Sequence, residues 1–188
     1  MARLPDPRVT ASPEALAEIE RMASVRSHAE GHAELGQVYI AMFNNPEVAK
    51  LVGALGEHLR FEGVLPDAIR ESVILRAAAR RGFAYEWSHH VRPATLAGLE
   101  ESTIAALAED TVPAGLDREQ AAAVQAADRA LAGEEIPDDV QSVIVDAWGT
   151  EGVVELVALC GLYGLIGSMV EAFGIEVEPG FPAAPFAG

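Results

Sequence analysis

Hydrophobic positions recur at helical spacing along most of this chain. Apolar residues repeat every three or four positions after Ser12, after Asn45 and after Pro66, as the buried face of an amphipathic helix requires. No segment alternates apolar and polar positions with β-branched side chains over the length of a strand. The pattern therefore predicts an all-α protein, and no linker divides the chain into two domains.

Prolines and capping residues give the expected boundaries of the helices. Ser12-Pro13 and Asn45-Pro46 each place a capping side chain before a proline at the first helical position. We expect helices over residues 12–27, 33–43, 45–60, 66–81, 84–97, 101–109, 118–131, 138–148 and 151–173. The helical domain thus spans 12–173, between an extended N-terminal arm over 1–11 and an extended tail over 174–188 that is rich in Pro and Gly.

The last predicted helix carries Gly161, Gly164 and Gly167 at intervals of three residues. A glycine inside a helix costs about 1 kcal/mol relative to alanine. Close approach of another helix is the usual compensation, so we expect this helix at the centre of the core or at a subunit interface. Cys160 lies in the same helix and is expected to be an inert core residue.

Composition and charge narrow the choice of partners and compartment. The formal net charge is −16, and a field of that sign repels both phosphate backbones and anionic lipids. We therefore expect neither nucleic acid nor a membrane as a partner. The single cysteine excludes an internal disulfide or a CxxC redox pair. The N-terminal residues lack the apolar core of a secretory signal, and the longest uncharged apolar run, 156–170, is short for a membrane span. We expect a cytoplasmic protein.

Three ionisable residues, Glu71, Glu86 and His90, fall on helix faces that are otherwise apolar. Glu71 shares its face with Leu75 and other apolar residues. Glu86 and His90 are four residues apart, so their side chains can meet on one helix surface. A hairpin that turns at Gly82 would bring Glu71 towards them. Because charged groups are costly to bury without a partner or a task, we take this hairpin as the candidate site.

The chemistry that such a trio offers is proton transfer. One of two neighbouring carboxylates in an apolar pocket tends to hold a proton. A histidine oriented by a carboxylate can relay protons near neutral pH. Tyr85 and His89 are candidates for polar contacts with a substrate, and Arg76 is a candidate for holding a substrate carboxylate. The alternative is structural: the first glutamate pairs with a buried arginine, and the second forms a surface pair with the histidine.

A metal site is not expected. His28 and His32 are four residues apart, a spacing at which two imidazoles on a helix can bind zinc. However, Gly31 interrupts the helix between them, and no glutamate directly follows the first histidine.

The hairpin resembles the carboxymuconolactone decarboxylase family, which also contains the AhpD-type alkylhydroperoxidases. The resemblance rests on Arg70-Glu71, the helix around Leu75, Tyr85-Glu86-Trp87, His90 and Ala97-Gly98-Leu99, and it extends from about Asn45 to Glu171. It implies a single AhpD-like helical bundle that assembles as a homotrimer or homohexamer.

The same resemblance argues against one branch of that family. In the peroxidase branch a glutamate precedes a CxxCxxxH motif. The glutamate and the histidine fall at Glu71 and His90 here, but the two cysteine positions fall at Phe83 and Glu86. Without a thiol pair we expect no disulfide-based peroxidase activity.

The lactone decarboxylase branch has a glutamate four residues before the histidine, and it works without a cofactor. The resemblance therefore implies a cofactor-free lyase or isomerase that acts on a small carboxylated lactone or related organic acid. Glu71 and Glu86 would share general acid and base duty, and His90 would move or orient the proton. Two other functions remain open: a redox-associated protein without thiol peroxidase activity, and a non-catalytic oligomeric binding protein.

Overall fold

The computed structural model describes residues 4–30 and 35–186, and every regular element in these ranges is helical. The α-helices are α1 (Pro13–Glu30), α2 (Gln37–Met42), α3 (Pro46–Glu57), α4 (Asp67–Arg81), α5 (Ala84–Leu96), α6 (Glu101–Ala106), α7 (Arg118–Ala132) and α8 (Asp138–Phe173). A 3-10 helix, η1 (Pro7–Val9), precedes them, and a π-helical turn, η2 (His58–Glu62), follows α3. The prediction of an all-α chain is confirmed.

Helix α8 joins two segments that the sequence predicts as separate helices. They meet at Gly149, whose backbone is not helical (φ 71°, ψ −179°). The two segments therefore follow each other without a loop, and glycine is suited to this position because its positive φ strains other residues.

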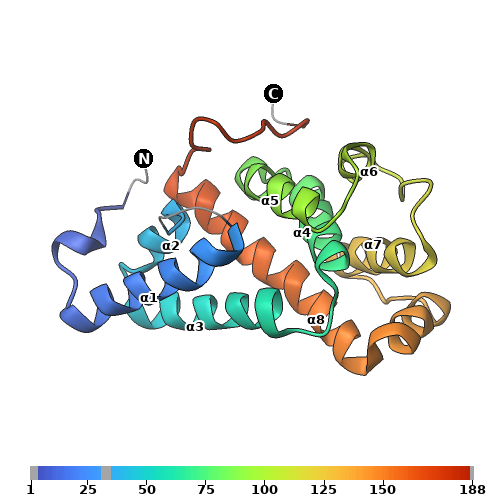
Figure 1. Cartoon of the computed structure of the whole chain (residues 1–188), viewed down its shortest axis with the longest axis horizontal. Helices are drawn as coiled ribbons and strands as arrows, with labels where there is room; N and C mark the ends of the chain where they lie inside the picture. The colour runs from blue at the N-terminus through green and yellow to red at the C-terminus, as the bar shows by residue number, and fades with distance from the viewer. Residues whose placement is uncertain (1–3, 31–34, 187–188) are drawn as a thin grey trace.

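Helix α8 is also the element around which the others are arranged (Figure 1). It runs diagonally beneath α4 and α5, with α1 to α3 towards one end and α6 and α7 towards the other. Its most extensive contacts are with α7 and α4. By length and composition α8 is the one described helix that could cross a membrane, but half of its most apolar stretch is buried inside the protein. Burial of this kind is typical of a core helix.

One of the three glycines in α8 permits a close approach. A Cβ atom at Gly167 would overlap the ring of Phe83, the residue before α5. At Gly161 and Gly164, by contrast, no described atom beyond the neighbouring residues and the adjacent backbone of α8 lies within 4 Å of the place that a Cβ would take. Gly167 therefore gives room to a side chain at the start of α5 and not to the backbone of another helix, whereas Gly161 and Gly164 lie where the described residues do not cover α8.

Cys160 of α8 is buried, and burial raises its pKa to about 12. A thiol with so high a pKa is protonated at neutral pH and is a poor nucleophile. These properties are those of the core residue that the sequence predicts.

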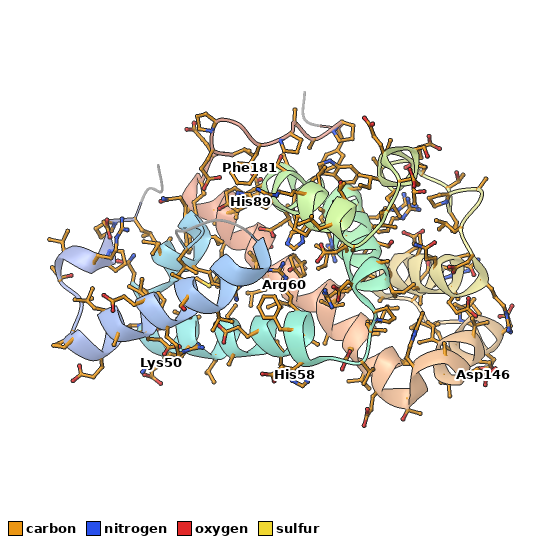
Figure 2. The ribbon with its side chains drawn as sticks, in the orientation of Figure 1. Lys50, His58, Arg60, His89, Asp146 and Phe181 are labelled. Atoms are coloured by element: carbon orange, nitrogen blue, oxygen red, sulfur yellow. The ribbon has the colours of Figure 1, made fainter. Side chains whose placement is uncertain are left out.

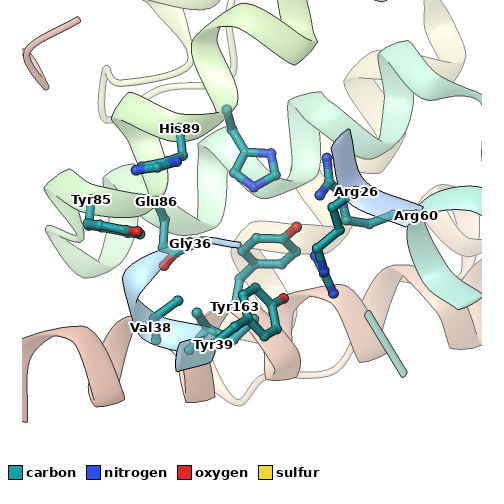
Figure 3. Close-up of a pocket in the computed structure, with 11 residues that line it drawn as sticks. Arg26, Gly36, Val38, Tyr39, Arg60, Tyr85, Glu86, His89 and Tyr163 are labelled. Atoms are coloured by element: carbon teal, nitrogen blue, oxygen red, sulfur yellow. The ribbon is translucent and has the colours of Figure 1, made fainter. Parts of the chain in front are cut away.

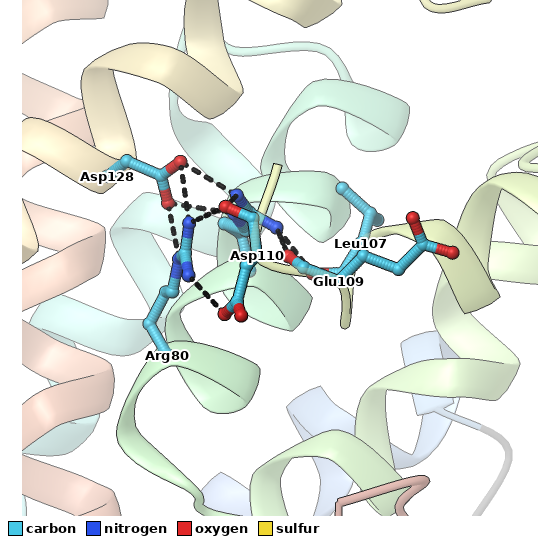
Figure 4. A network of polar contacts seen from close by, with 6 residues as sticks. Arg80, Leu107, Glu109, Asp110 and Asp128 are labelled. Atoms are coloured by element: carbon cyan, nitrogen blue, oxygen red, sulfur yellow. Dashed lines mark hydrogen bonds and ion pairs between the residues drawn. The ribbon is translucent and has the colours of Figure 1, made fainter. Parts of the chain in front are cut away.

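Helix α4 is tied to α7 by a buried arginine (Figure 4). The Arg76 side chain is completely buried, and its Nε and one terminal nitrogen each donate to the Asp128 carboxylate at 2.8 Å. The other terminal nitrogen donates to the backbone carbonyl groups of Leu107 and Glu109, which follow α6. Arg80, one turn further along α4, also donates to Asp128. This network fixes α4, α7 and the connection between α6 and α7.

Replacement of Arg76 by Met should lower the free energy of unfolding by about 3 kcal/mol, because two carbonyl groups lose their donor and the partly buried Asp128 carboxylate keeps only Arg80 as a partner. Urea denaturation followed by circular dichroism measures the change. The matched control is Arg118→Met at an exposed position of α7, which should cost less than about 0.5 kcal/mol. Equal losses in the two variants would contradict the structural role of Arg76.

Candidate functional site

The site is built on the hairpin of α4 and α5. Helix α4 ends at Gly82, whose left-handed conformation (φ 69°) lets the chain reverse almost at once into α5. This turn brings Glu71 of α4 against His90 of α5, so that Nδ1 of His90 lies 2.7 Å from Oε2 of Glu71. Both side chains are buried, so the pair lies in the interior.

The surroundings keep Glu71 ionised. Burial acts to raise the pKa of this carboxyl group, but the charge and hydrogen bond of His90, with the charges of Arg60 and Arg70, hold the pKa below its usual value of 4.5. The nearest guanidinium nitrogens of Arg60 and Arg70 lie 4.0 Å and 3.7 Å from Oε1 of Glu71. An ionised carboxylate can only accept hydrogen bonds, so Nδ1 of His90 carries a proton and donates it. In neutral His90, Nε2 then presents a lone pair.

His90 faces a cavity of about 40 Å³, which has room for about three water molecules. Residues of α1, α2, α5, α8 and η2 line this cavity, together with Gly36, which precedes α2. Figure 3 shows Arg26 and Arg60 on one side of it and Tyr85, Glu86 and His89 on the other. The wall thus combines charged and polar groups with aromatic rings, as small-molecule sites do.

A second cavity, of about 350 Å³, lies beside Glu71, the residue that is hydrogen-bonded to His90. Glu71 lines it together with Arg70 and Pro93, and Arg60 lines both cavities. The hydrogen bond from His90 to Glu71 therefore joins a residue of the first cavity to a residue of the second.

Most of the residues expected at the site share the first cavity. The cavity is lined by Tyr85, Glu86, His89 and His90. Glu71 does not line it but is hydrogen-bonded to His90, which does. The structure does not bring Arg76 there, because its guanidinium group is bound to Asp128 and to backbone carbonyl groups in the contact of α4 with α7. Contrary to the expectation from the sequence, Arg76 therefore does not face the cavity and cannot hold a substrate carboxylate there.

Three buried residues of the cavity are missing from the sequence prediction. Arg26 follows Met22 by four positions on the buried face of α1, so the signal that found Glu71 was present here too. Arg60 lies in η2, and nothing in the sequence marks this π-helical turn. Tyr163 of α8 lies within a long apolar run, yet its ring meets the ring of His90 edge-on at a centroid distance of 4.9 Å.

The C-terminal tail also takes part in the site (Figure 2). One carboxylate oxygen of Glu178 lies 2.8 Å from Nε2 of His89, and the other accepts a hydrogen bond from the Tyr85 hydroxyl at 3.3 Å. The ring of Phe181 stacks on His89 at a centroid distance of 4.1 Å. The tail thus holds two residues of the cavity wall, which its Pro- and Gly-rich composition did not indicate.

No group of three His, Cys, Asp or Glu residues within the described ranges is placed to hold a metal ion. Of the histidine pair discussed above, His32 and the side chain of His28 lie outside what the structure describes.

Residues 46–129, which include Glu71, Glu86 and His90, match the carboxymuconolactone decarboxylase family. This segment belongs to that family. It carries the whole of α3, α4, α5 and α6 and most of α7, and therefore the entire hairpin on which the site is built. The sequence matches no functionally curated protein.

Solved structures share the fold of this protein over most of its length. The debrominase Bmp8 is 16% identical over 90% of both chains, with a TM-score of 0.72. An uncharacterized peroxidase-related protein from Ralstonia eutropha JMP134, with an alkylhydroperoxidase AhpD core, is 18% identical over 95% of this chain and 93% of its own, with a TM-score of 0.75. A protein of unknown function from Agrobacterium tumefaciens is 21% identical over 73% and 94%, with a TM-score of 0.63. Identities this low establish an AhpD-like fold and nothing about the reaction.

The contact of the tail with α5 should weaken in acid. Burial acts to raise the pKa of Glu178, but its hydrogen bond with His89 and other contacts leave the pKa below 4.5. A carboxyl group of lowered pKa stabilises the folded form above its unfolded pKa and loses this contribution as the pH falls through its folded pKa. Release of the tail should therefore begin below pH ~4.5.

The fluorescence of Trp87 reports on this release, because the ring of Phe186 packs edge-on against it at 5.4 Å. In a Trp148→Phe background, Glu178→Gln should give red-shifted emission already at pH 7, while circular dichroism shows the helices intact. Glu171→Gln, at an exposed position at the end of α8, should leave the wild-type acid profile unchanged. Identical profiles for Glu178→Gln and the wild type would show that Glu178 does not hold the tail.

Proposed function

We propose that this protein is a cofactor-free lyase of the carboxymuconolactone decarboxylase type, acting by proton transfer on a small carboxylated lactone or related organic acid. The observation that carries the proposal is the 2.7 Å hydrogen bond between His90 and Glu71, beside a cavity that Glu86 also lines. The family to which the hairpin belongs supports the same class of reaction.

The three residues have different tasks in this reaction. Glu71 holds His90 in one tautomer and stabilises its protonated form, so it positions the proton donor without touching the substrate. Its lowered pKa fits this task better than the acid–base role expected from the sequence. His90 transfers the proton through Nε2. Glu86 lines the cavity and exchanges a proton with an oxygen atom of the substrate.

In decarboxylation the bond between a ring carbon and its carboxylate breaks, and CO₂ leaves. The electron pair stays on the ring carbon, where a neighbouring unsaturated carbonyl group delocalises it. His90, protonated on Nε2, delivers its proton to that carbon and becomes neutral. One proton is thus consumed for each CO₂ released, and solvent returns it to His90.

Nothing in the described part of the chain favours thiol chemistry. Phe83 and Glu86 stand where the peroxidase branch has its cysteines, and Cys160 is buried with a raised pKa. We therefore extend neither the debromination named for Bmp8 nor peroxide reduction to this protein.

Substitution of the proton donor tests the proposal. On the carboxylated lactone that the wild type converts fastest, His90→Gln should lower kcat at least ~100-fold, because general acid–base catalysis contributes about that much. Glu71→Gln should also lower kcat, since it removes the charge that orients His90 and stabilises its protonated form.

The matched control is His58→Gln in η2, at a side chain that is 56% exposed, and it should leave kcat unchanged within about twofold. Cys160→Ser should be equally neutral. Absence of turnover by the wild type on every lactone tried, or full turnover by His90→Gln, would contradict the proposed function.

We propose further that α8 provides the contact in a homotrimer or homohexamer. Gly161 and Gly164 present open backbone on its uncovered face, and Val154 and Leu165 are 69% and 43% exposed. An apolar stripe with small residues suits close packing against a second copy of this chain, and removal of these side chains from water would stabilise the assembly.

The molar mass of the protein, measured by light scattering as it elutes from a size-exclusion column, tests this contact. The wild type should have three or six times the 19.8 kDa mass of the chain, and Leu165→Glu should shift it towards 19.8 kDa, because a charge on the stripe is costly to bury. Val9→Glu, at an exposed position of η1, is the control and should retain the wild-type mass. A monomeric wild type would refute the assembly.

We also propose a cytoplasmic location. A lone, buried cysteine suits a reducing compartment, where disulfides are rare. The apolar stretch of α8 that could cross a membrane is half buried in this fold, which supports its role as a core helix.

A further inference from the structure

The cavity beside His90 is smaller than the ligands that its chemistry suits. It has room for about three water molecules, whereas a five-membered lactone with one carboxylate has about nine non-hydrogen atoms. Such a ligand enters only if part of the wall moves. This requirement rests on the proposed function, since that function supplies the size of the ligand.

The wall of the cavity meets solvent at Gly36 and His89. Of the eleven described residues that line it, these two are partly exposed and the remaining nine are buried. Tyr85 lies between them: its hydroxyl is 3.4 Å from the place that a Cβ at Gly36 would take, and its ring stacks on His89 at a centroid distance of 4.2 Å. A movement of Tyr85 and His89 would therefore open the cavity and leave the rest of its wall in place.

The C-terminal tail holds this part of the wall from outside. The Glu178 carboxylate contacts both side chains, with its oxygens 2.8 Å from Nε2 of His89 and 3.3 Å from the Tyr85 hydroxyl. Phe181 stacks on His89 as well, so the imidazole lies between the rings of Phe181 and Tyr85. Two residues of the tail thus hold the two side chains that would have to move.

The middle of the tail, residues 176–183, is attached less firmly than its ends. Each of these residues is at least partly exposed, whereas Ile175 before them and Ala184 after them are buried. A segment with few buried side chains opens at a low cost in free energy. Residues 176–183 can therefore lift from α5 while the buried residues on either side anchor the tail.

We propose that residues 176–183 form a gate over the cavity, and that the contacts of Glu178 with His89 and Tyr85 keep it closed. When the carboxylate leaves these two side chains, they turn outward with the segment and open the wall beside Gly36 to a ligand. After entry the same contacts form again. The closed gate then keeps bulk water away from the proton transfer, as closing loops do in many enzymes.

Labelling of a thiol inside the cavity measures the opening. Val38 lines the cavity and is 2% exposed, so the reporter is Val38→Cys in a Cys160→Ser background. The reagent is dithiobis(nitrobenzoic acid), which is too large for the closed cavity. At pH 7, Glu178→Gln should raise the labelling rate at least ~10-fold, because it removes a charged hydrogen-bond partner. Phe181→Leu should raise the rate too, since it removes the ring that stacks on His89.

Three controls separate opening of the gate from unfolding of the protein. Glu171→Gln, at an exposed position at the end of α8, should keep the labelling rate of the parent. The native Cys160 is buried and does not line the cavity, so in a chain that retains it Glu178→Gln should leave its labelling rate unchanged. Low concentrations of urea should also leave the rate of the reporter unchanged, because local opening exposes little surface.

Equal labelling rates in Glu178→Gln and its parent, or an equal rise at Cys160, would overturn the gate. Labelling of the parent as fast as that of an exposed thiol would do the same. If Val38→Cys does not fold, Ile166→Cys places the reporter in the same cavity. His90→Gln separates the gate from the proposed function: this variant should lose turnover and keep the labelling rate of the parent.

Discussion

Helix α4 carries charged side chains into the interior of the protein, and the need to pair each of them shapes the molecule around it. Arg76 is met by Asp128 of α7 and by carbonyl groups that follow α6. Glu71 is met by His90 of α5, with Arg60 of η2 and Arg70 nearby. Because an unpaired buried charge would cost several kcal/mol, these contacts fix the positions of α5, η2 and α7 relative to α4.

The same requirement creates the site. The groups that surround Glu71 keep it ionised, and an ionised Glu71 leaves His90 only one tautomer, with Nε2 directed away from the carboxylate. If Glu71 and His90 paired only to compensate for their burial, no cavity with further charged groups would be needed beside them. Here, however, His90 also faces a cavity with two guanidinium groups and a further carboxylate. That combination favours acid–base chemistry on an organic acid over a purely structural role.

The sequence predicted the hairpin better than it predicted the function of each charge. A charged residue on an apolar helix face signals burial, and Gly82 signals the turn, so Glu71 and His90 could be placed together. The same signal cannot say what a buried charge will meet, which is why Arg76 was expected at the site and lies in the contact of α4 with α7. The inward position of Arg60 depends on a π-helical turn, and that of Glu178 on how the tail crosses α5, and local sequence patterns encode neither.

The tautomer of His90 is the most direct test of this account, because the orientation of His90 by Glu71 is its central claim. Nitrogen NMR of the protein labelled at the histidine ring nitrogens distinguishes the two neutral forms. We expect that neutral His90 carries its proton on Nδ1, and that Glu71→Gln weakens this preference. A proton on Nε2 in the wild type, or a tautomer that does not respond to Glu71→Gln, would contradict it.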